Sequence, residues 1–286
     1  MAARQAGGEA DSDAIWIPAL ARGLIREDLA RSIRYCDGYT DILGPSRPAK
    51  RSLAQRAMQS PIVAAIYERI WRPVLLAILS LHGLSISAER ERAATALHLG
   101  GEQRVLDVAC GPGNFTNFFA DKLDGSGFVI GLDNSLPMID RAIRDNSGAR
   151  AVYMRADALD LPFDDGMFDV VCCFAALHLV PEPMGVLHEM VRVLAPGGRI
   201  AVMTSYGRES FLVRKALELG ATICGVRVFD RTTVPAFLAA AGLVDIDQEL
   251  RGISQFVAAC RKNGTDFDRW RMRSSGWTAG RRSDDH

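Results

Sequence analysis

The residues with the clearest chemical potential lie in one short run, Val105-Leu106-Asp107-Val108-Ala109-Cys110-Gly111-Pro112-Gly113-Asn114. Here an apolar strand is expected to end in a glycine-rich turn, and a helix is expected to begin at Asn114. Such a turn presents backbone N–H groups to a ligand, and its glycines let the ligand approach the main chain closely. Asp107 lies inside the strand, and Asp133 ends the next apolar run, where a carboxylate commonly accepts ribose hydroxyls. The pattern favours a nucleotide-like ligand over a plain strand-to-helix turn.

Two common nucleotide-binding patterns fit this loop poorly. A dinucleotide fingerprint has a third glycine where this chain has Thr116, and Asp107 would repel a pyrophosphate group. The Walker sequence of ATP-hydrolysing proteins is absent from the chain. The sequence therefore disfavours both a nicotinamide-dependent reductase and an ATPase.

Short apolar strands that alternate with helical stretches are expected to position these residues. After residue 100 the strand-like runs are 104–109, 128–133, 151–155, 168–174 and 199–205. Near-continuous apolar strands separated by helices predict a parallel sheet that is covered on both faces. Two further candidate strands, 243–250 and 254–261, are joined by only three residues. That link is too short for a parallel crossover, so these two strands are expected to form an antiparallel hairpin.

The N-terminal part of the chain has a different pattern. Residues 19–35 carry leucines and isoleucine at helical spacing with arginines between them, which predicts an amphipathic helix. Residues 62–70 predict a second helix that Pro73 ends or kinks before another, very apolar one. No internal repeat is visible.

Composition narrows the class of protein. The 286 residues include 34 basic and 34 acidic side chains, and 48% of them are hydrophobic, which is ordinary globular usage. Zero net charge removes the simplest electrostatic case for a nucleic-acid partner. The six cysteines form no C-x-x-C pair, so we expect neither a disulfide framework nor a structural metal site, and a reducing compartment fits best.

The chain also lacks the sequence features of export or membrane insertion. The N-terminal residues have no basic and apolar regions of a signal peptide, and the most apolar run, 74–86, is shorter than the roughly 20 residues that a bilayer requires. We expect a cytoplasmic protein without a transmembrane segment, and peripheral contact with a membrane surface stays open.

Taken in order, these motifs resemble the class I S-adenosylmethionine-dependent methyltransferases, especially the small-molecule group that includes the quinone-biosynthesis C-methyltransferases. The resemblance covers roughly residues 90–205. Residues 107–113 are similar to the family's first motif, with Ala109 where its first glycine usually lies. Residues 156–163 are similar to the segment that lines the adenine, and residues 168–171 to the fourth strand. Residues 187–198, with Glu189 and Arg192, are similar to the helix and turn before the fifth strand.

The resemblance implies an α/β fold with a Rossmann-like doubly wound sheet, mostly parallel with a terminal antiparallel hairpin, and an N-terminal helical extension. We divide the chain into a leader and helical lid at 1–87, a methyltransferase domain at 88–262 and a disordered tail at 263–286. The implied cofactor is S-adenosylmethionine, and Asp133 would accept its ribose hydroxyls. Met138 is expected either to contact the cofactor or to be an ordinary core residue of its helix. The expected cofactor-binding residues are Asp107, Ala109, Gly111, Gly113, Asn114, Asp133, Asn134, Met138, Asp157, Ala158 and Phe174.

Methyl transfer is an in-line displacement, which depends mainly on proximity and alignment, worth up to ~7–11 kcal/mol in favourable models. The enzyme therefore needs no nucleophile of its own, and a carboxylate at Asp107 can attract the cationic methionine end. His178 follows the fourth strand, where an imidazole could deprotonate or hydrogen-bond an acceptor. A structural histidine is the equal alternative. We take His178 as the catalytic candidate.

The acceptor is expected to be a small, partly apolar or aromatic molecule, because residues 62–86 carry few charges. Tyr67 and Trp71 share a helical face and are either pocket wall or core. An RNA or DNA methyltransferase is one alternative, because residues 22–56 carry eight basic and four acidic side chains. Residues 35–43 are also similar to the end of a zinc knuckle on some methyltransferases, including RNA-modifying ones. With one cysteine there, the four-ligand metal site cannot form from this segment. A non-catalytic S-adenosylmethionine-binding protein is the other alternative, which the intact acids disfavour.

Overall fold

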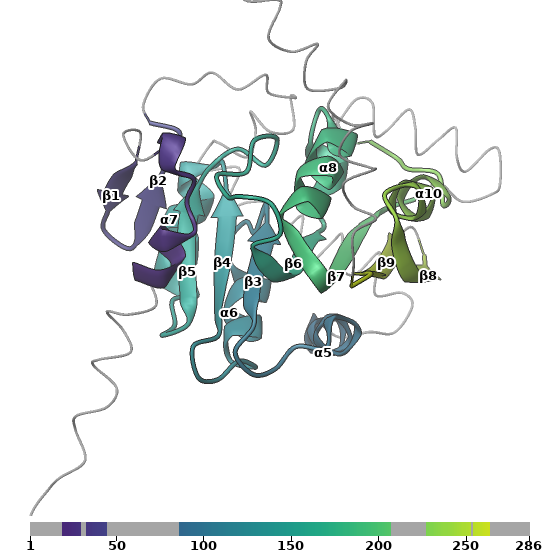
Figure 1. The fold of residues 1–286 in the computed structure, drawn as a ribbon, viewed down its shortest axis with the longest axis horizontal. Coiled ribbons are helices and arrows are strands. Elements are labelled where there is room, and N and C mark those ends of the chain that lie inside the picture. The colour runs from purple at the N-terminus through teal and green to yellow at the C-terminus, as the bar shows by residue number, and fades with distance from the viewer. Residues whose placement is uncertain (1–18, 30–32, 45–85, 207–226, 253, 264–286) are drawn as a thin grey trace, which may run out of the picture.

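The computed structural model describes residues 19–29, 33–44, 86–206, 227–252 and 254–263, which build one nine-stranded sheet flanked by helices (Figure 1). The strand order is β1-β2-β5-β4-β3-β6-β7-β9-β8. The strands are β1 (Arg34–Cys36), β2 (Tyr39–Asp41), β3 (Arg104–Val108), β4 (Phe128–Asp133), β5 (Ala151–Arg155), β6 (Phe168–Phe174), β7 (Leu194–Ser205), β8 (Leu243–Arg251) and β9 (Ser254–Arg261).

The central strands are parallel, as their apolar character predicts. β2, β5, β4, β3, β6 and β7 run in one direction, and β9 pairs antiparallel with both β7 and β8. The chain proceeds from β3 outward to β4 and β5, then returns to the other side of β3 to form β6. Ligands of open α/β sheets bind at the carboxyl edge near such a reversal. The Rossmann-like fold with a terminal antiparallel hairpin is therefore confirmed.

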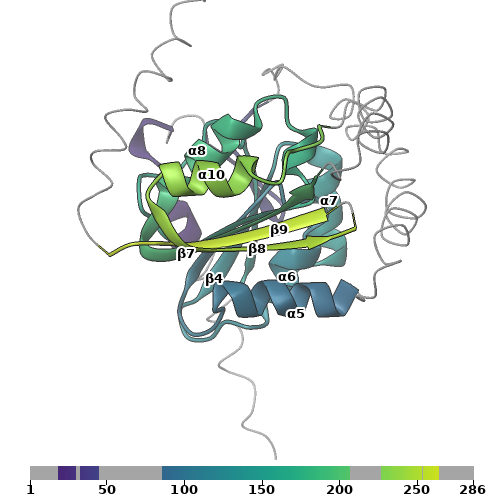
Figure 2. The same cartoon turned by 90° about the vertical axis from the view of Figure 1, so that its right-hand side faces the viewer.

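Helices cover both faces of this sheet (Figure 2). α5 (Ile86–Leu97) and α6 (Asn114–Ala120) pack on one face, and α8 (Pro183–Val193) and α10 (Thr233–Ala240) pack on the other. α7 (Leu136–Asp145) packs beside β5, and the short 3₁₀ helix η3 (Leu177–Leu179) lies between β6 and α8. Among the described residues, no helix is both long and apolar enough to cross a bilayer.

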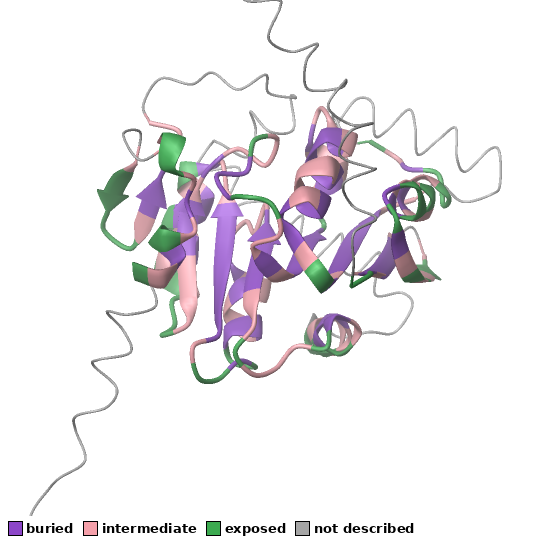
Figure 3. Cartoon of the chain, viewed as in Figure 1, coloured by how far each residue is buried: buried purple, intermediate pink, exposed green. Residues whose placement is uncertain are grey.

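Two separate apolar clusters divide the core between these faces, and the central strands are buried on both sides (Figure 3). Along β7 the side chains alternate between the clusters, because successive residues of a strand point to opposite faces. Val202 belongs to the cluster under α8 and α10, whereas Met203 belongs to the cluster over α5 and α6.

The N-terminal segment departs from the single amphipathic helix expected over residues 19–35. The structure has a short helical stretch at 19–23, a 3₁₀ turn η1 (Glu27–Leu29), and then β1 and β2 joined at Asp37-Gly38. β2 pairs parallel with β5, and its Asp41 is buried between the Arg34 and Arg155 side chains at 2.7 and 3.3 Å. This tertiary pairing outweighs the local helical pattern. Residues 34–41, which the sequence places in the lid segment at 1–87, are part of the sheet.

Candidate functional site

The glycine-rich loop between β3 and α6 has a left-handed backbone at alternate residues. Ala109, Gly111 and Gly113 have φ angles of 56°, 55° and 78°. This region is uncommon for residues with a Cβ, so Ala109 carries local strain of the kind that gathers at functional sites. A Cβ added to Gly113 would collide with the Tyr153 hydroxyl, whereas one added to Gly111 would meet nothing within 4 Å. Gly111 thus has open space beside it, where a ligand could approach the main chain.

Asp133, the last residue of β4, binds this loop directly. Its Oδ2 accepts the Gly111 N–H at 2.9 Å, and its Oδ1 accepts the Ser135 N–H at 2.8 Å. Burial raises the pKa of Asp133, and these backbone donors oppose that rise. Each carboxylate oxygen can accept more than one hydrogen bond, so capacity for a ligand's hydroxyls is retained. The carboxylate therefore lies beside the loop, as the sequence predicts.

Asp107 on β3 is a buried acid with unusual electrostatics. The Thr116 hydroxyl donates to its Oδ2 at 2.7 Å, and the Cys172 thiol lies 3.7 Å from its Oδ1. Burial raises the pKa of Asp107 to about 7, although the hydrogen bonds from Thr116 and Cys172 partly oppose it. No lysine or arginine in the described ranges forms an ion pair with this carboxylate. Asp107 is therefore prepared to be charged once a cation lies beside it.

Thr116 is a candidate site residue that the sequence patterns did not identify. Its position was significant only because a dinucleotide fingerprint would have glycine there, but its hydroxyl is the hydrogen-bond partner of Asp107. The nine-residue separation places Thr116 on the first turns of α6, directly over the strand that carries Asp107. A polar residue one turn into the helix, after an acid within the strand, is the signal that could have identified this pair.

The segment between β5 and β6 carries the next candidates. The Asp157 Oδ1 accepts the Leu159 N–H at 3.0 Å, which closes a local turn, and Ala158 is partly buried against the core. Asn134 follows β4, and its carbonyl accepts a hydrogen bond from the Arg155 Nε at 3.4 Å. Met138 is buried on α7. The carboxyl ends of β4 and β5 thus bring these predicted residues to one edge of the sheet.

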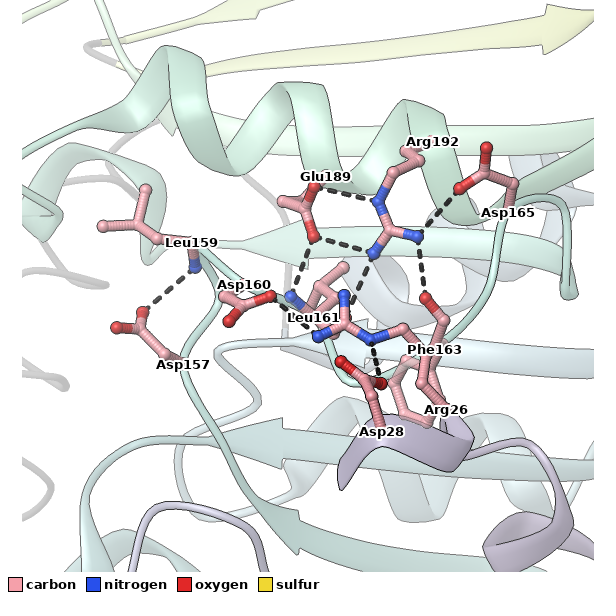
Figure 4. A network of polar contacts seen from close by, with 10 residues as sticks. All are labelled: Arg26, Asp28, Asp157, Leu159, Asp160, Leu161, Phe163, Asp165, Glu189 and Arg192. Carbon is pink, nitrogen blue, oxygen red and sulfur yellow. Dashed lines mark hydrogen bonds and ion pairs between the residues drawn. The ribbon is translucent and has the colours of Figure 1, made fainter. Parts of the chain in front are cut away.

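An ion-pair network in α8 fixes the shape of this segment (Figure 4). Arg192 donates to both oxygens of Glu189, at 2.9 and 2.8 Å, and also to the carbonyls of Phe163 and Leu161, at 2.7 and 3.0 Å. The Glu189 Oε2 in turn accepts the Leu161 N–H at 2.8 Å. Burial alone would lower the pKa of Arg192, but the hydrogen bonds and charges of Glu189 and Asp165 raise it. The sequence resemblance identified Glu189 and Arg192 but did not predict that they hold this segment.

The N-terminal segment holds the same stretch from another side. The Arg26 N–H donates to the Pro162 carbonyl at 3.0 Å, and Ile25 forms an antiparallel bridge with Phe163. The Arg26 guanidinium lies between Asp160, at 3.2 Å, and Asp28, at 3.3 Å (Figure 4). Residues 157–163 are therefore held between α8 and the N-terminal segment.

β6, the neighbour of β3, ends in a second strained residue. Ala175 has a φ of 55°, and its N–H donates to the Met203 carbonyl at 2.9 Å. Phe174 before it stacks on Phe256 with a centroid distance of 6.1 Å and an interplanar angle of 9°. Two adjacent parallel strands thus both lead into a left-handed alanine at the carboxyl edge, a concentration of strain typical of binding sites.

His178 lies just beyond, in η3. Its Nδ1 is buried and has no hydrogen-bond partner among the residues that the structure describes. Burial lowers the pKa of His178 to about 4, so the imidazole is neutral at pH 7.

The other predictions fall outside this arrangement. Tyr67 and Trp71, the expected pocket residues, lie outside the described residues. Within the described part of the chain, no group of three or more His, Cys, Asp or Glu side chains could hold a metal ion.

Comparison with known proteins gives one family and several relatives. Residues 105–198 match the family described as a methyltransferase domain. A demethylmenaquinone methyltransferase of Lactiplantibacillus plantarum is 34% identical over 129 residues, which cover 44% of this chain and 54% of that protein. A 2-phytyl-1,4-naphtoquinone methyltransferase of Synechococcus elongatus is 35% identical over 159 residues, which cover 53% of this chain and 65% of that protein. The chain thus spans between about half and two thirds of the length of these relatives.

Solved structures share the fold, and one of them illustrates the similarity. The phospholethanolamine N-methyltransferase 2 of Haemonchus contortus, in complex with phosphomonomethylethanolamine and S-adenosylhomocysteine, superimposes with a TM-score of 0.56 at 17% identity. The match covers 77% of this chain and 61% of that one. At this level of identity the similarity concerns the fold alone.

Proposed function

We propose that this chain carries a class I S-adenosylmethionine-dependent methyltransferase domain similar to the quinone-biosynthesis enzymes. The domain methylates a small, partly apolar or aromatic acceptor. S-Adenosylmethionine is the cofactor. The observation that carries the proposal is the row of acids Asp107, Asp133 and Asp157 near the carboxyl ends of β3, β4 and β5. These strands are adjacent, and the left-handed loop lies directly beside the acids.

The residues of this edge fit the cofactor. Asp133 would accept hydrogen bonds from the ribose hydroxyls, and Asp157 would accept a hydrogen bond from the exocyclic amine of adenine. Asp107 is a buried acid without a cation in the described part of the chain, which suits the ammonium and sulfonium end. The open space beside Gly111 leaves room for a ligand against the main chain. The remaining proposed contacts are Ala109, Gly113, Asn114, Asn134, Met138, Ala158 and Phe174.

When bound, S-adenosylmethionine supplies an electrophilic methyl group. The chain's own contribution is to bind and align, which can contribute up to about 7–11 kcal/mol when two reactants are well oriented. The bonds from Arg192 and Glu189 hold the adenine-lining segment in one shape, so cofactor binding requires little reordering there. His178, neutral at pH 7, would accept a proton or a hydrogen bond from the acceptor.

Two features support the choice of acceptor. The relatives are named for demethylmenaquinone and for 2-phytyl-1,4-naphtoquinone, which are apolar aromatic molecules. Residues 62–86 of this chain carry few charges, whereas a phosphate backbone would require a dense track of basic residues. A cytoplasmic location is part of the same proposal, because the cysteines suit a reducing compartment.

Methyl incorporation from labelled S-adenosylmethionine tests the proposal. The full-length chain is incubated separately with total RNA, DNA and a lipid-quinone extract, and Asp133→Ala serves as the site-specific control. We expect label in the extract alone, and loss of that label in the control. Salt-sensitive labelling of RNA or DNA without labelling of the extract would overturn the proposal in favour of a nucleic-acid methyltransferase.

A further inference from the structure

Two uncharged side chains, His178 and Thr204, each bury a polar atom that has no hydrogen-bond partner in the part of the chain that the structure describes. The atoms are the Nδ1 of His178 and the Oγ1 of Thr204. Buried polar atoms are nearly always paired, because an unpaired one loses its hydration without compensation. Each of these atoms is therefore a candidate contact for a ligand.

Both residues lie at the carboxyl edge, on neighbouring strands or directly after them. Thr204 is next to the last residue of β7, and the pairing of Phe174 with Met203 places it level with Ala175 at the end of β6. His178 follows three residues later in η3, and η3 packs against β7. This is the same edge that presents the proposed cofactor site.

Thr204 points to the face of the sheet on which η3 packs. Since side chains alternate along a strand, Thr204 points to the same face as Val202 and away from the face of Met203. Val202 belongs to one apolar cluster with Leu177, the residue before His178 in η3. Met203 belongs to the cluster on the opposite face. The hydroxyl of Thr204 therefore points toward the layer that contains η3.

The residue opposite Thr204 on β9 is polar, but its side chain is engaged elsewhere. Gln255 of β9 is its antiparallel partner and is fully buried. However, the Gln255 Oε1 accepts a hydrogen bond from the Gln248 Nε2 at 3.0 Å, and its Nε2 contacts the Ser205 carbonyl at 3.5 Å. The hydroxyl of Thr204 therefore remains available for a partner that the described part of the chain does not supply.

Arg227 holds η3 against the end of β7. Its N–H donates to the His178 carbonyl at 2.8 Å, and its carbonyl accepts the Ser205 hydroxyl at 2.9 Å. Its guanidinium also reaches the Pro181 carbonyl at 3.3 Å. Arg227 therefore connects η3, which carries His178, to the end of β7, which carries Thr204.

We propose that Thr204 and His178 form the polar end of the acceptor site and bind a phenolic hydroxyl on an otherwise apolar acceptor. The hydroxyl would donate to the Nδ1 of His178 and accept from the Oγ–H of Thr204, so both unpaired atoms gain a partner. The apolar cluster on this face of the sheet includes Leu177, Val180 and Phe229 and suits an aromatic ring. This inference rests on the proposed function and names its substrate class: a hydroxylated aromatic acceptor, with Thr204 as a specificity-determining residue.

Calorimetry with two probes tests this assignment. The full chain, saturated with S-adenosylhomocysteine, is titrated with 1-naphthol and with 1-methylnaphthalene, which has the same ring system without the hydroxyl. We expect 1-naphthol to bind about 10-fold more tightly, as one well-made hydrogen bond pair would give. Thr204→Val should remove most of that preference and leave the affinity for 1-methylnaphthalene and S-adenosylhomocysteine unchanged.

Thermal unfolding of the same variant provides a readout that does not depend on the probe. Thr204→Val deletes a buried unpaired hydroxyl at constant shape, so the ligand-free Tm should stay the same or rise. Thr116→Val is the matched control: it deletes a buried hydroxyl that does have a partner, Asp107, so its Tm should fall.

Two results would overturn the assignment of Thr204 and His178 to the acceptor site, and a third would refute the proposed function. A lower Tm for Thr204→Val would show that its hydroxyl has a structural partner, which overturns the inference. Equal affinity of the native chain for 1-naphthol and 1-methylnaphthalene would overturn it as well. Failure of the native chain to bind S-adenosylhomocysteine would instead refute the proposed function itself.

Discussion

The buried acid Asp107 should make the stability of the ligand-free protein depend on pH in a direction opposite to that of a salt-bridged carboxylate. The pKa of Asp107 is about 7 in the folded chain, against 3.8 for an ordinary Asp. Between these values the folded state retains a proton that the unfolded state has lost. The stability contributed by this group is therefore fully present below pH 3.8 and is lost as the pH rises to 7.

The size of the effect follows from the two pKa values. Their difference of about three units corresponds to about 4 kcal/mol, at 1.36 kcal/mol per unit. At pH 5 the unfolded state is already mostly deprotonated at Asp107, so part of the loss in stability occurs below that pH. About 3 kcal/mol of the change should therefore fall between pH 5 and pH 8. Asp107→Asn removes the ionisable group, and its amide oxygen can still accept the hydrogen bond from Thr116.

Urea unfolding of the native chain and of Asp107→Asn at pH 5, 6, 7 and 8 measures this difference. The stability of the variant relative to the native chain should rise by about 3 kcal/mol from pH 5 to pH 8. Thr116→Val removes a donor that stabilises the charged carboxylate, so it should move the transition to higher pH. Parallel pH profiles for the native chain and Asp107→Asn would contradict a raised pKa, because they would mean that Asp107 titrates alike in the folded and the unfolded state.

Three further outcomes are expected. Asp133→Ala should weaken S-adenosylmethionine binding by a few kcal/mol in calorimetry, since each charge-assisted hydrogen bond contributes about 1.5–3 kcal/mol, and equal affinities would reject the site. His178→Ala should lower turnover by about 10²-fold with nearly unchanged affinity for S-adenosylhomocysteine, whereas an unchanged rate would make His178 structural. Arg192→Lys keeps the charge but loses the paired contacts with Glu189, so the KM for S-adenosylmethionine should rise several-fold while kcat changes little; unaltered KM in a folded variant would exclude a positioning role.

The sheet and its loop follow from local sequence patterns. The strands that carry Asp107 and Asp133 are short apolar runs, and the glycines between Ala109 and Asn114 permit the left-handed backbone that the turn requires. The terminal hairpin follows from the three-residue link after β8. In each case the information lies within about ten residues, which is why the sequence suffices.

Other parts of the site depend on residues that meet only in three dimensions. β2 pairs with β5, and Asp41 reaches Arg155 across 114 positions of the chain, so nothing local in residues 34–41 indicates a strand. Glu189 binds the Leu161 N–H across 28 positions, and its contribution to the shape of residues 157–163 becomes visible only when α8 packs on the sheet. The unpaired hydroxyl of Thr204 is similar, because its lack of a partner depends on how Gln255 is engaged.

Calorimetric titration of the full-length chain with S-adenosylmethionine and, separately, with NADH shows which of the two ligands the carboxyl edge of the sheet binds. The arrangement of Asp107, Asp133 and the left-handed loop predicts that S-adenosylmethionine binds at one site per chain, that Asp133→Ala weakens this binding, and that NADH gives no saturable heat. Saturable binding of NADH, or no binding of S-adenosylmethionine by the folded chain, would contradict the assignment of this edge as an S-adenosylmethionine site.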